Sequence, residues 1–146
     1  MICNYHEEDN YFTERAINYN RNVTKGKIIV LGRKLFEELG ELCPVVLQES
    51  TVVVLSKDKE YKDFDKGNIV VFNEIEPVIK QCLNFESNDD KEVFVLGGRK
   101  LNKQMINYVD NIHVIQENDN EFTHESFELT QIDTVEDIKY LLYKRI

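Results

Sequence analysis

The sequence predicts an α/β fold in three layers: a mostly parallel central sheet with helices on both faces and an antiparallel hairpin at the C-terminal side. One observation is a set of short, β-branched runs that suit strands buried on both faces, namely residues 27–31, 51–55, 68–72 and 93–96. A second is that segments with helical periodicity separate these runs. A third is that no helical segment interrupts the strand-like segments after residue 110. The length of 146 residues suits one domain, residues 1–146.

The first two helices are predicted from their end signals. One spans Thr13 to about Val23, with Thr13 as its N-cap. Before it, the segment "MICNY" can supply at best a short strand. The next covers residues 33–39, and Gly40 is expected to end it because glycine is common just past a helix C-terminus.

Two further helices are predicted from apolar spacing. Residues 74–85 carry apolar side chains at helical intervals, and Pro77 lies early enough to occupy a first turn. The segment 99–109 places three apolar residues on one face: Leu101, Met105 and Val109.

The C-terminal part predicts strands only. After the strand-like segment 111–116, residues 126–132 and 138–145 are joined across "DTVED", which is typical of an antiparallel hairpin with a loop of several residues.

Composition excludes several classes of protein. The formal net charge is −9, and nucleic-acid binding would need a basic face, so no nucleic-acid partner is expected. No apolar run approaches the roughly 18 residues of a membrane helix, and the first residues lack the pattern of a signal peptide. We therefore expect a cytoplasmic protein without a membrane association. The three cysteines are scattered without a C-x-x-C pair, so no metal site is predicted.

One pattern occurs twice: an apolar run followed by glycine, arginine and lysine. It appears as "IIVLGRKLFE" (28–37) and as "VFVLGGRKLN" (93–102). Each copy places a glycine at the carboxyl end of a parallel strand, directly before a helix whose N-terminus carries about half a positive charge. This chemistry suits an anion, most often a phosphate. Two such turns on adjacent strands could hold a pyrophosphate from both sides.

A plainer interpretation stays open beside this one. Glycine after a strand is often only a tight turn, and arginine or lysine on a helix is often only solvated surface.

These segments resemble those of the dihydrofolate reductase family. The stretch "GRKLFEELG" (32–40) is similar to the family's G-R-[KH]-T-[FW]-E segment with its following glycine. The stretch "TVVVLSKD" (51–58) resembles the next strand, and "VFVLGGRKLNKQ" (93–104) resembles the segment with two glycines. The resemblance covers roughly residues 13–146 and implies a dihydrofolate-reductase-like domain.

The resemblance implies a site for NADPH, and each candidate residue has an implied place. Gly32, Arg33 and Lys34 would meet phosphate groups at the first repeated turn, while Ser56 and Lys57 would lie near the ribose phosphate of the adenosine. The pyrophosphate would be wrapped by the second turn: Gly97, Gly98, Arg99 and Lys100.

The folate half departs from the family pattern. The family's proton-supporting acid falls at Ala16, and Glu14 is the nearest candidate for a catalytic carboxylate. The segment "HEEDNYF" is too short to form the family's lid over a nicotinamide. Other family positions are also replaced here, by Leu35, Ser50, Asn102 and Ile115.

Two functions follow from this pattern. The first is a relative that holds a phosphate-bearing nucleotide, NADPH or a similar molecule, with its catalysis lost. The second is an active NADPH-dependent reductase of dihydrofolate or of another pteridine-like or pyrimidine-like substrate. A homo-oligomer or a protein partner at the shortened front of the sheet is a further expectation.

Overall fold

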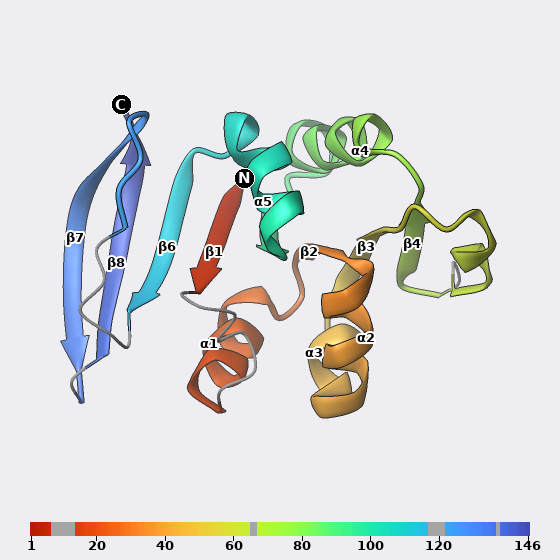
Figure 1. The fold of residues 1–146 in the computed structure, drawn as a ribbon, viewed down its shortest axis with the longest axis horizontal. Helices are drawn as coiled ribbons and strands as arrows, with labels where there is room; N and C mark the ends of the chain where they lie inside the picture. The colour runs from red at the N-terminus through yellow and green to blue at the C-terminus, as the bar shows by residue number, and fades with distance from the viewer. Residues whose placement is uncertain (7–13, 65–66, 117–121, 137) are drawn as a thin grey trace.

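A computed structural model describes residues 1–6, 14–64, 67–116, 122–136 and 138–146 of the chain. These residues form an α/β fold with one sheet of eight strands in the order β4-β3-β2-β5-β1-β6-β8-β7 (Figure 1). The strands are β1 (Ile2–His6), β2 (Ile28–Gly32), β3 (Thr51–Leu55), β4 (Ile69–Phe72), β5 (Val93–Gly97), β6 (Asn111–Gln116), β7 (Phe127–Val135) and β8 (Ile138–Arg145).

The pairing agrees with the predicted fold class. All neighbouring pairs from β4 to β6 are parallel, whereas β8 pairs antiparallel with both β6 and β7. The hairpin of β7 and β8 thus closes one side of the sheet, as the sequence predicts.

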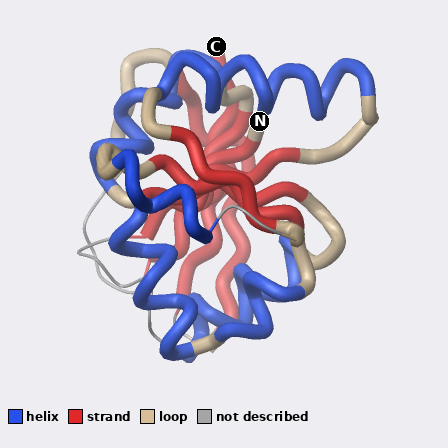
Figure 2. Tube along the Cα trace, turned by 90° about the vertical axis from the view of Figure 1, so that its right-hand side faces the viewer, coloured by secondary structure: helices blue, strands red, loops and turns tan. Residues whose placement is uncertain are grey.

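Helices cover both faces of the sheet, which gives three layers (Figure 2). They are α1 (Glu14–Thr24), α2 (Arg33–Leu42), α3 (Pro44–Gln48), α4 (Ile75–Asn88) and α5 (Arg99–Met105), with the 3₁₀ segments η2 (Lys59–Phe64) and η3 (Ile106–Tyr108). Helices α4 and α5 pack into one apolar core, while α1, α2 and α3 contribute to the core on the other face. Among the described residues no helix is long and apolar enough to cross a membrane.

Side chains of the central strands alternate between the two cores. In β2, Ile28 and Val30 belong to the core under α4 and α5, whereas Ile29 and Leu31 belong to the other. This alternation follows from the two-residue period of a strand, and it explains why the run is apolar throughout.

One expectation about an element is wrong. Helix α2 continues through Gly40 to Leu42. The residue that stops it is Pro44, because proline disfavours a helical conformation in the preceding residue, and Cys43 is non-helical with φ −152° and ψ 69°. Gly40 is an exposed helical residue, and a Cβ atom there would lie in ordinary contact with α3, 3.8 Å from Leu47 Cδ1.

The front of the sheet agrees with its expectation. Residues Ile2–His6 form a short strand of five residues that pairs in parallel with both β5 and β6. The expected partner at this part of the molecule stays a prediction. The predicted N-cap Thr13 and most of the short segment expected to replace the lid lie outside the described residues.

Candidate functional site

The two repeated glycine turns meet at one edge of the sheet. Gly32 ends β2 and Gly97 ends β5, and these strands are parallel neighbours with Leu31 opposite Gly97. A Cβ atom on Gly32 would lie 3.8 Å from the Gly98 nitrogen and 3.9 Å from the Gly97 oxygen. The prediction that both turns lie side by side at the carboxyl ends of adjacent strands is confirmed.

Each turn leads directly into a helix. Gly32 is the N-cap of α2 and Gly98 is the N-cap of α5, and neither N-cap makes a side-chain hydrogen bond. Neither helix has an acidic residue in its first turn. Backbone N–H groups at these ends are therefore not satisfied by a capping side chain, which suits an anionic ligand.

The second turn has room beside its backbone. Gly97 has a φ of +117°, a conformation that residues with a side chain rarely adopt. Gly98 has an ordinary φ of −76°, yet a Cβ atom added there would meet no atom within 4 Å. Glycine at position 98 is thus not required by the fold, and its backbone is open to a ligand.

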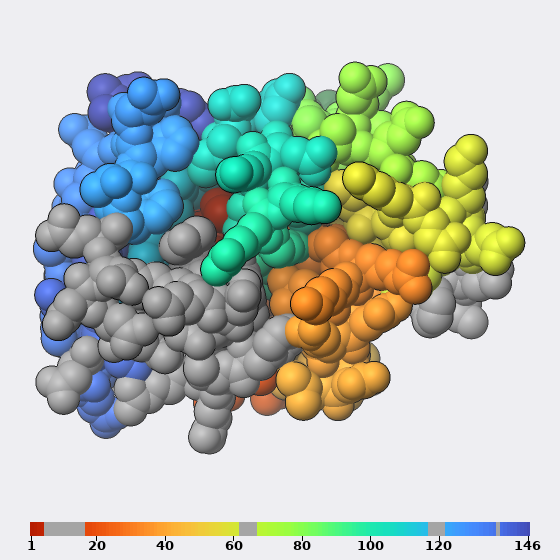
Figure 3. Space-filling model, in the orientation of Figure 1, coloured from red at the N-terminus to blue at the C-terminus, as the bar shows by residue number. Residues whose placement is uncertain are grey.

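Basic side chains surround both turns. Arg33 and Lys34 begin α2, Arg99 and Lys100 begin α5, and all four belong to exposed or half-exposed residues. On the face drawn in Figure 3, the surfaces of α2 and α5 adjoin, and the segment after β3 lies beside α2. This local positive charge stands out in a chain with a net charge of −9.

The predicted residues after β3 have different environments. Lys57 is exposed. Ser56 is buried, with 2% of its surface exposed, and its Oγ accepts a hydrogen bond from the Asp58 backbone N–H at 3.2 Å. Ser56 therefore shapes the loop, while Lys57 is the residue of the pair that faces solvent.

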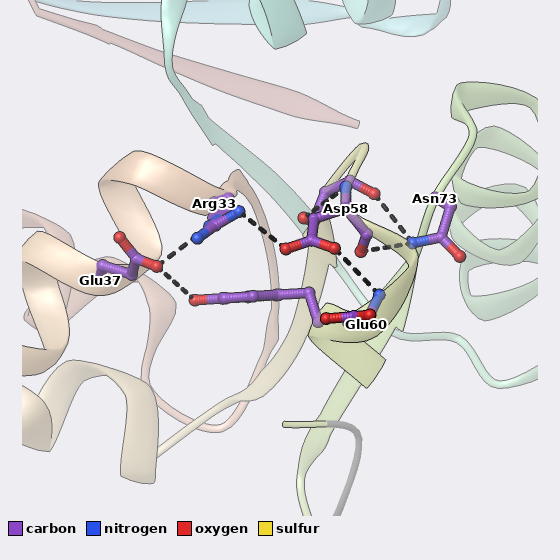
Figure 4. Close-up of polar contacts among 7 residues, drawn as sticks. Arg33, Glu37, Asp58, Glu60 and Asn73 are labelled. Carbon is purple, nitrogen blue, oxygen red and sulfur yellow. Dashed lines mark hydrogen bonds and ion pairs between the residues drawn. The ribbon is translucent and has the colours of Figure 1, made fainter. Parts of the chain in front are cut away.

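Arg33 is held by acidic neighbours, as Figure 4 shows. Its Nε donates to Glu37 Oε1 at 3.1 Å and its NH1 to Asp58 Oδ2 at 3.4 Å. The guanidinium also lies 4.5 Å from the ring centroid of Tyr61, whose hydroxyl donates to Glu37 at 3.1 Å. Hydrogen bonds from Arg33 and then Tyr61 hold the pKa of Glu37 below its usual 4.5.

Part of this cluster is visible in the sequence. Glu37 follows Arg33 at the i,i+4 spacing at which helical side chains pair. Asp58 and Tyr61 come from a different segment, after β3, and nothing in the sequence alone brings them to Arg33.

A cleft lies along one side of α5. It has a volume of about 650 Å³ and is lined by Arg99, Asn102 and Lys103 of α5, by Cys3 of β1, by Ile112 of β6 and by Phe122 and His124. This lining follows one side of α5 and includes none of the turn glycines, so the expectation that the N-terminus of this helix points at a cleft stays a prediction. Among the described residues, no three His, Cys, Asp or Glu side chains form a group that could hold a metal ion.

Positions that the resemblance assigns to folate contacts mostly serve the fold. Ser50 is buried and its Oγ donates to the Thr24 carbonyl at 2.8 Å. Asn102 and Ile115 are buried in α5 and β6. Glu14, the candidate acid, is the first residue of α1, and Ala16 follows in its first turn.

Two polar pairs join α1 to the sheet. Asn4 Nδ2 donates to Asn20 Oδ1 at 2.9 Å in a buried position. The Tyr19 hydroxyl lies 3.0 Å from His113 Nδ1. Of these residues only Asn4 gives a signal in the sequence, because it is polar within a segment that otherwise reads as a strand.

Comparison with known proteins agrees with this arrangement. The sequence profile of the dihydrofolate reductase family matches residues 13–137. The dihydrofolate reductase of Mycoplasma genitalium is 30% identical over 105 residues, which are 71% of this chain and 61% of that protein. That of Staphylococcus haemolyticus is 30% identical over 96 residues, or 66% of this chain and 51% of that protein. The chain thus matches between about half and three fifths of the length of these relatives.

A solved structure shares the fold. Dihydrofolate reductase from Enterococcus faecalis, complexed with NADP(H) and RAB-propyl, superimposes with a TM-score of 0.69 at 18% identity, covering 99% of this chain and 95% of that one. Because the family profile covers most of the chain, and because the strand order and the two glycine turns fit it, this protein belongs to the dihydrofolate reductase family.

Proposed function

We propose that this protein is a reductase that holds a nicotinamide dinucleotide across its two glycine turns and reduces dihydrofolate or a related pterin. The observation that carries the proposal is the contact between the turns at Gly32 and Gly97–Gly98 in a member of this family. NADPH is the dinucleotide expected from the family, and the similar Enterococcus structure was solved with NADP(H).

The residues present fit such a cofactor. Gly98 leaves open space beside the backbone, and α2 and α5 start there without capping side chains or acids in their first turns. Exposed Lys34 and Lys100, with Arg33 and Arg99, supply positive charge for a pyrophosphate. When bound, the dinucleotide supplies a hydride to the substrate, while the turns fix the position of its phosphates.

Glu14 is the carboxylate that we propose for supporting protonation of the substrate. It opens α1, and the family position for this acid, two residues later, is alanine. A positioned acid or base contributes about 10²–10⁴ in rate, so removing the Glu14 carboxylate should cost activity on this scale.

A second candidate function is a nucleotide-binding protein without reductase activity. Ala16 at the position of the acid, and Leu35 in place of a threonine, favour it. The relatives matched at 30% identity carry the name dihydrofolate reductase, and for that reason the active enzyme is the main proposal.

Binding is tested by thermal unfolding with NADPH in wild type and in Gly98→Ala. At a hundredfold excess over Kd a ligand adds about 2.7 kcal/mol to the free energy of unfolding. For a chain of this size that raises Tm by roughly 5–10 °C. The Gly98→Ala variant should keep the Tm of the free protein and lose this shift, because its methyl group enters the space proposed for the ligand.

Gly97→Ala is a comparison in which the substitution strains the backbone of the free protein. Its φ of +117° is unfavourable for alanine, so this variant should lose about 1–3 kcal/mol of stability even without ligand. An equal NADPH shift in wild type and Gly98→Ala would contradict the proposed site.

Turnover is tested by the loss of NADPH absorbance on adding dihydrofolate. Activity that Glu14→Gln reduces by about a hundredfold or more supports Glu14 as the acid. NADPH binding without turnover would instead establish the second candidate function.

A further inference from the structure

A buried pair of amide side chains joins the central strand β1 to α1. Asn4 Nδ2 donates to Asn20 Oδ1 at 2.9 Å, and the two residues have 0% and 6% of their surfaces exposed. Asn4 Oδ1 is buried as well, yet it accepts no hydrogen bond from any residue that the structure describes. Because a buried acceptor without a donor is costly, a ligand that brings a donor to this oxygen would gain a favourable contact.

Asn4 lies where β1 and β5 cease to pair. The register of this parallel pair ends at Cys3 opposite Val95, although the two strands continue to His6 and Gly97. Toward β6, by contrast, β1 stays paired along its whole length. Asn4 is therefore the first residue of β1 beyond its last pair with β5, and it lies two residues, or about 7 Å, before the carboxyl end of the strand.

The same place is the switch point of the sheet. After β1 the chain passes to α1, which contributes to the core shared with α2 and α3, whereas after β5 it passes to α5 on the opposite face. In open α/β sheets, ligands bind beyond the carboxyl ends of adjacent strands whose connections leave toward opposite faces. The glycine turn that ends β5 borders this point on one side, and Asn4 borders it on the other.

Helix α1 places the amide pair close to the position of the family's acid. That position is Ala16, and Asn20 follows it by four residues, one turn later on the same side of the helix. Figure 1 shows α1 at the arrowhead end of β1. On the proposed function, a substrate ring that faces position 16 would therefore lie about one helical turn, roughly 5.4 Å, from the amide pair.

The orientation of the Asn4 amide selects the chemistry of its ligand. Its Nδ2 already donates to Asn20, and its Oδ1 is the atom without a described partner. An amide oxygen only accepts hydrogen bonds, so the matching group on a ligand is an amino group or a ring N–H. A pterin ring carries both kinds of donor. A ring with a carbonyl oxygen at the same place would bring two acceptors together and bind less well.

We propose that Asn4 determines the substrate class of this site by accepting, through Oδ1, a hydrogen bond from an N–H group of a pteridine ring. The inference rests on the proposed function and adds to it a side chain that recognises the substrate. Asn20 holds the Asn4 amide in this orientation through the hydrogen bond between them.

The test is isothermal titration calorimetry with dihydrofolate and, separately, with NADPH, on wild type and on Asn4→Leu. Leucine has the branching of asparagine but no polar atom. The dissociation constant for dihydrofolate should rise about tenfold, as expected for the loss of one buried hydrogen bond. The dissociation constant for NADPH should stay within about threefold, because both glycine turns are unchanged. A purely structural role of Asn4 would weaken both ligands alike or neither of them.

Two further variants complete the comparison. Asn4→Leu combined with Asn20→Leu replaces both partners by apolar groups, which avoids a buried amide that has lost its donor, and it makes the same test if the single variant does not fold. Thr24→Val is the matched control. It removes a buried hydroxyl at the end of the same helix, where Thr24 Oγ1 donates to the Asn20 carbonyl, and it should leave both dissociation constants unchanged.

The outcomes distinguish this inference from the proposed function. If wild type binds dihydrofolate and Asn4→Leu binds it equally well, or if Asn4→Leu weakens NADPH as much as dihydrofolate, the role of Asn4 is overturned while the reductase proposal stands. If wild type binds NADPH and does not bind dihydrofolate, the second candidate function holds, and this inference fails together with the reductase.

Discussion

His113 on β6 lies half-buried against Tyr19 of α1, with 3.0 Å between its Nδ1 and the tyrosine hydroxyl. Burial lowers the pKa of His113 below the usual 6.5, and the charge of Glu92 partly opposes this. Burial also raises the pKa of Tyr19 to about 12, so its hydroxyl stays protonated and can donate to a neutral imidazole. The folded protein therefore favours the uncharged form of His113.

Because of this lowered pKa of His113, the free energy of unfolding should increase as the pH rises. Below pH 6.5 the unfolded chain binds a proton at His113 more readily than the folded chain does, so the free energy of unfolding rises with pH. The contribution should be complete above about pH 6.5 and be lost as the pH falls through the lower folded pKa. Urea unfolding between pH 5 and about pH 8 measures this dependence.

The variant His113→Gln should flatten this part of the stability profile, because glutamine does not titrate. His124→Gln is the comparison, since it removes an imidazole that lies away from Tyr19 and whose Nδ1 accepts from the Ser126 N–H. A profile that is unchanged by His113→Gln would place the pH dependence on another group.

For single residues, the sequence predicts their place in a strand, turn or helix better than it predicts which side chains they contact. The placing of Gly32, Gly97 and Gly98 follows from short-range rules, since each ends a strand or begins a helix. The capture of Arg33 by Asp58 does not follow, because the two residues are 25 positions apart and meet only when β2 and β3 pair. The repeated glycine–arginine–lysine pattern therefore does not reveal that the charge of Arg33 is paired with a carboxylate.

The C-terminus of α4 shows how one residue can strain the end of an element. The helix runs to Asn88, Asp89 is its C-cap with φ −104°, and Asp90 follows with φ 49°. The left-handed conformation costs a residue with a side chain roughly 1–2 kcal/mol, whereas glycine adopts it freely. An acidic residue is also unfavourable near the negative end of a helix dipole.

We expect Asp90→Gly to raise the free energy of unfolding by about 0.5–1 kcal/mol, which is the relief of this conformation less the greater entropy of glycine in the unfolded chain. Asp89→Gly removes the same charge at a position with an ordinary φ and should bring no such gain. Chemical denaturation of both variants and of wild type gives the comparison. Equal effects in the two would assign the change to charge alone.

Elements were predictable where hydrophobic periodicity is strong. Leu101, Met105 and Val109 are the buried apolar side chains of α5 and the segment after it, as the spacing predicts. The end of α2 was not predictable in this way, because Gly40 and Pro44 are both residues that commonly stop a helix, and the structure shows that the helix passes Gly40 and stops before Pro44. The sequence of β1 is only a weak strand pattern, because the segment is short and contains the polar Asn4. Pairing with strands on both sides stabilises it.

For the molecule as a whole, the sheet divides the interior into two cores, and cysteines lie in or beside both of them. Cys3 and Cys82 are buried in the core under α4 and α5, with 2% and 0% of their surfaces exposed. Burial raises the pKa of each thiol to about 12. Cys43 is only partly buried and packs at the edge of the other core. One thiol is thus accessible in the folded protein and two require opening of the structure.

Labelling with a thiol-reactive dye should therefore show one fast thiol and two slow ones. The thiolate is the reactive form, and in Cys3 and Cys82 both access and ionisation are blocked by the fold. If only global unfolding exposes them, their labelling should be slower than that of Cys43 by a factor of at least ~10³, the ratio of folded to unfolded molecules at about 5 kcal/mol. The variant Cys43→Ser should remove the fast phase and leave the slow one.

The slow phase also reports on the cofactor site without any catalytic turnover. A dinucleotide that binds only the folded protein lowers the unfolded fraction by a factor of 1 + [L]/Kd, so at a hundredfold excess over Kd the labelling of Cys3 and Cys82 should slow by about a hundredfold. Cys82 lines no part of the cleft beside α5, whereas Cys3 does, so slower labelling of Cys82 together with an unchanged Cys43 phase separates linkage from direct blocking of the dye. If Cys82 slows and Cys3 does not, β1 opens independently of the rest of the sheet. If neither slows while NADPH is bound, both thiols are reached by local opening, and the core under α4 and α5 is less cooperative than its packing implies.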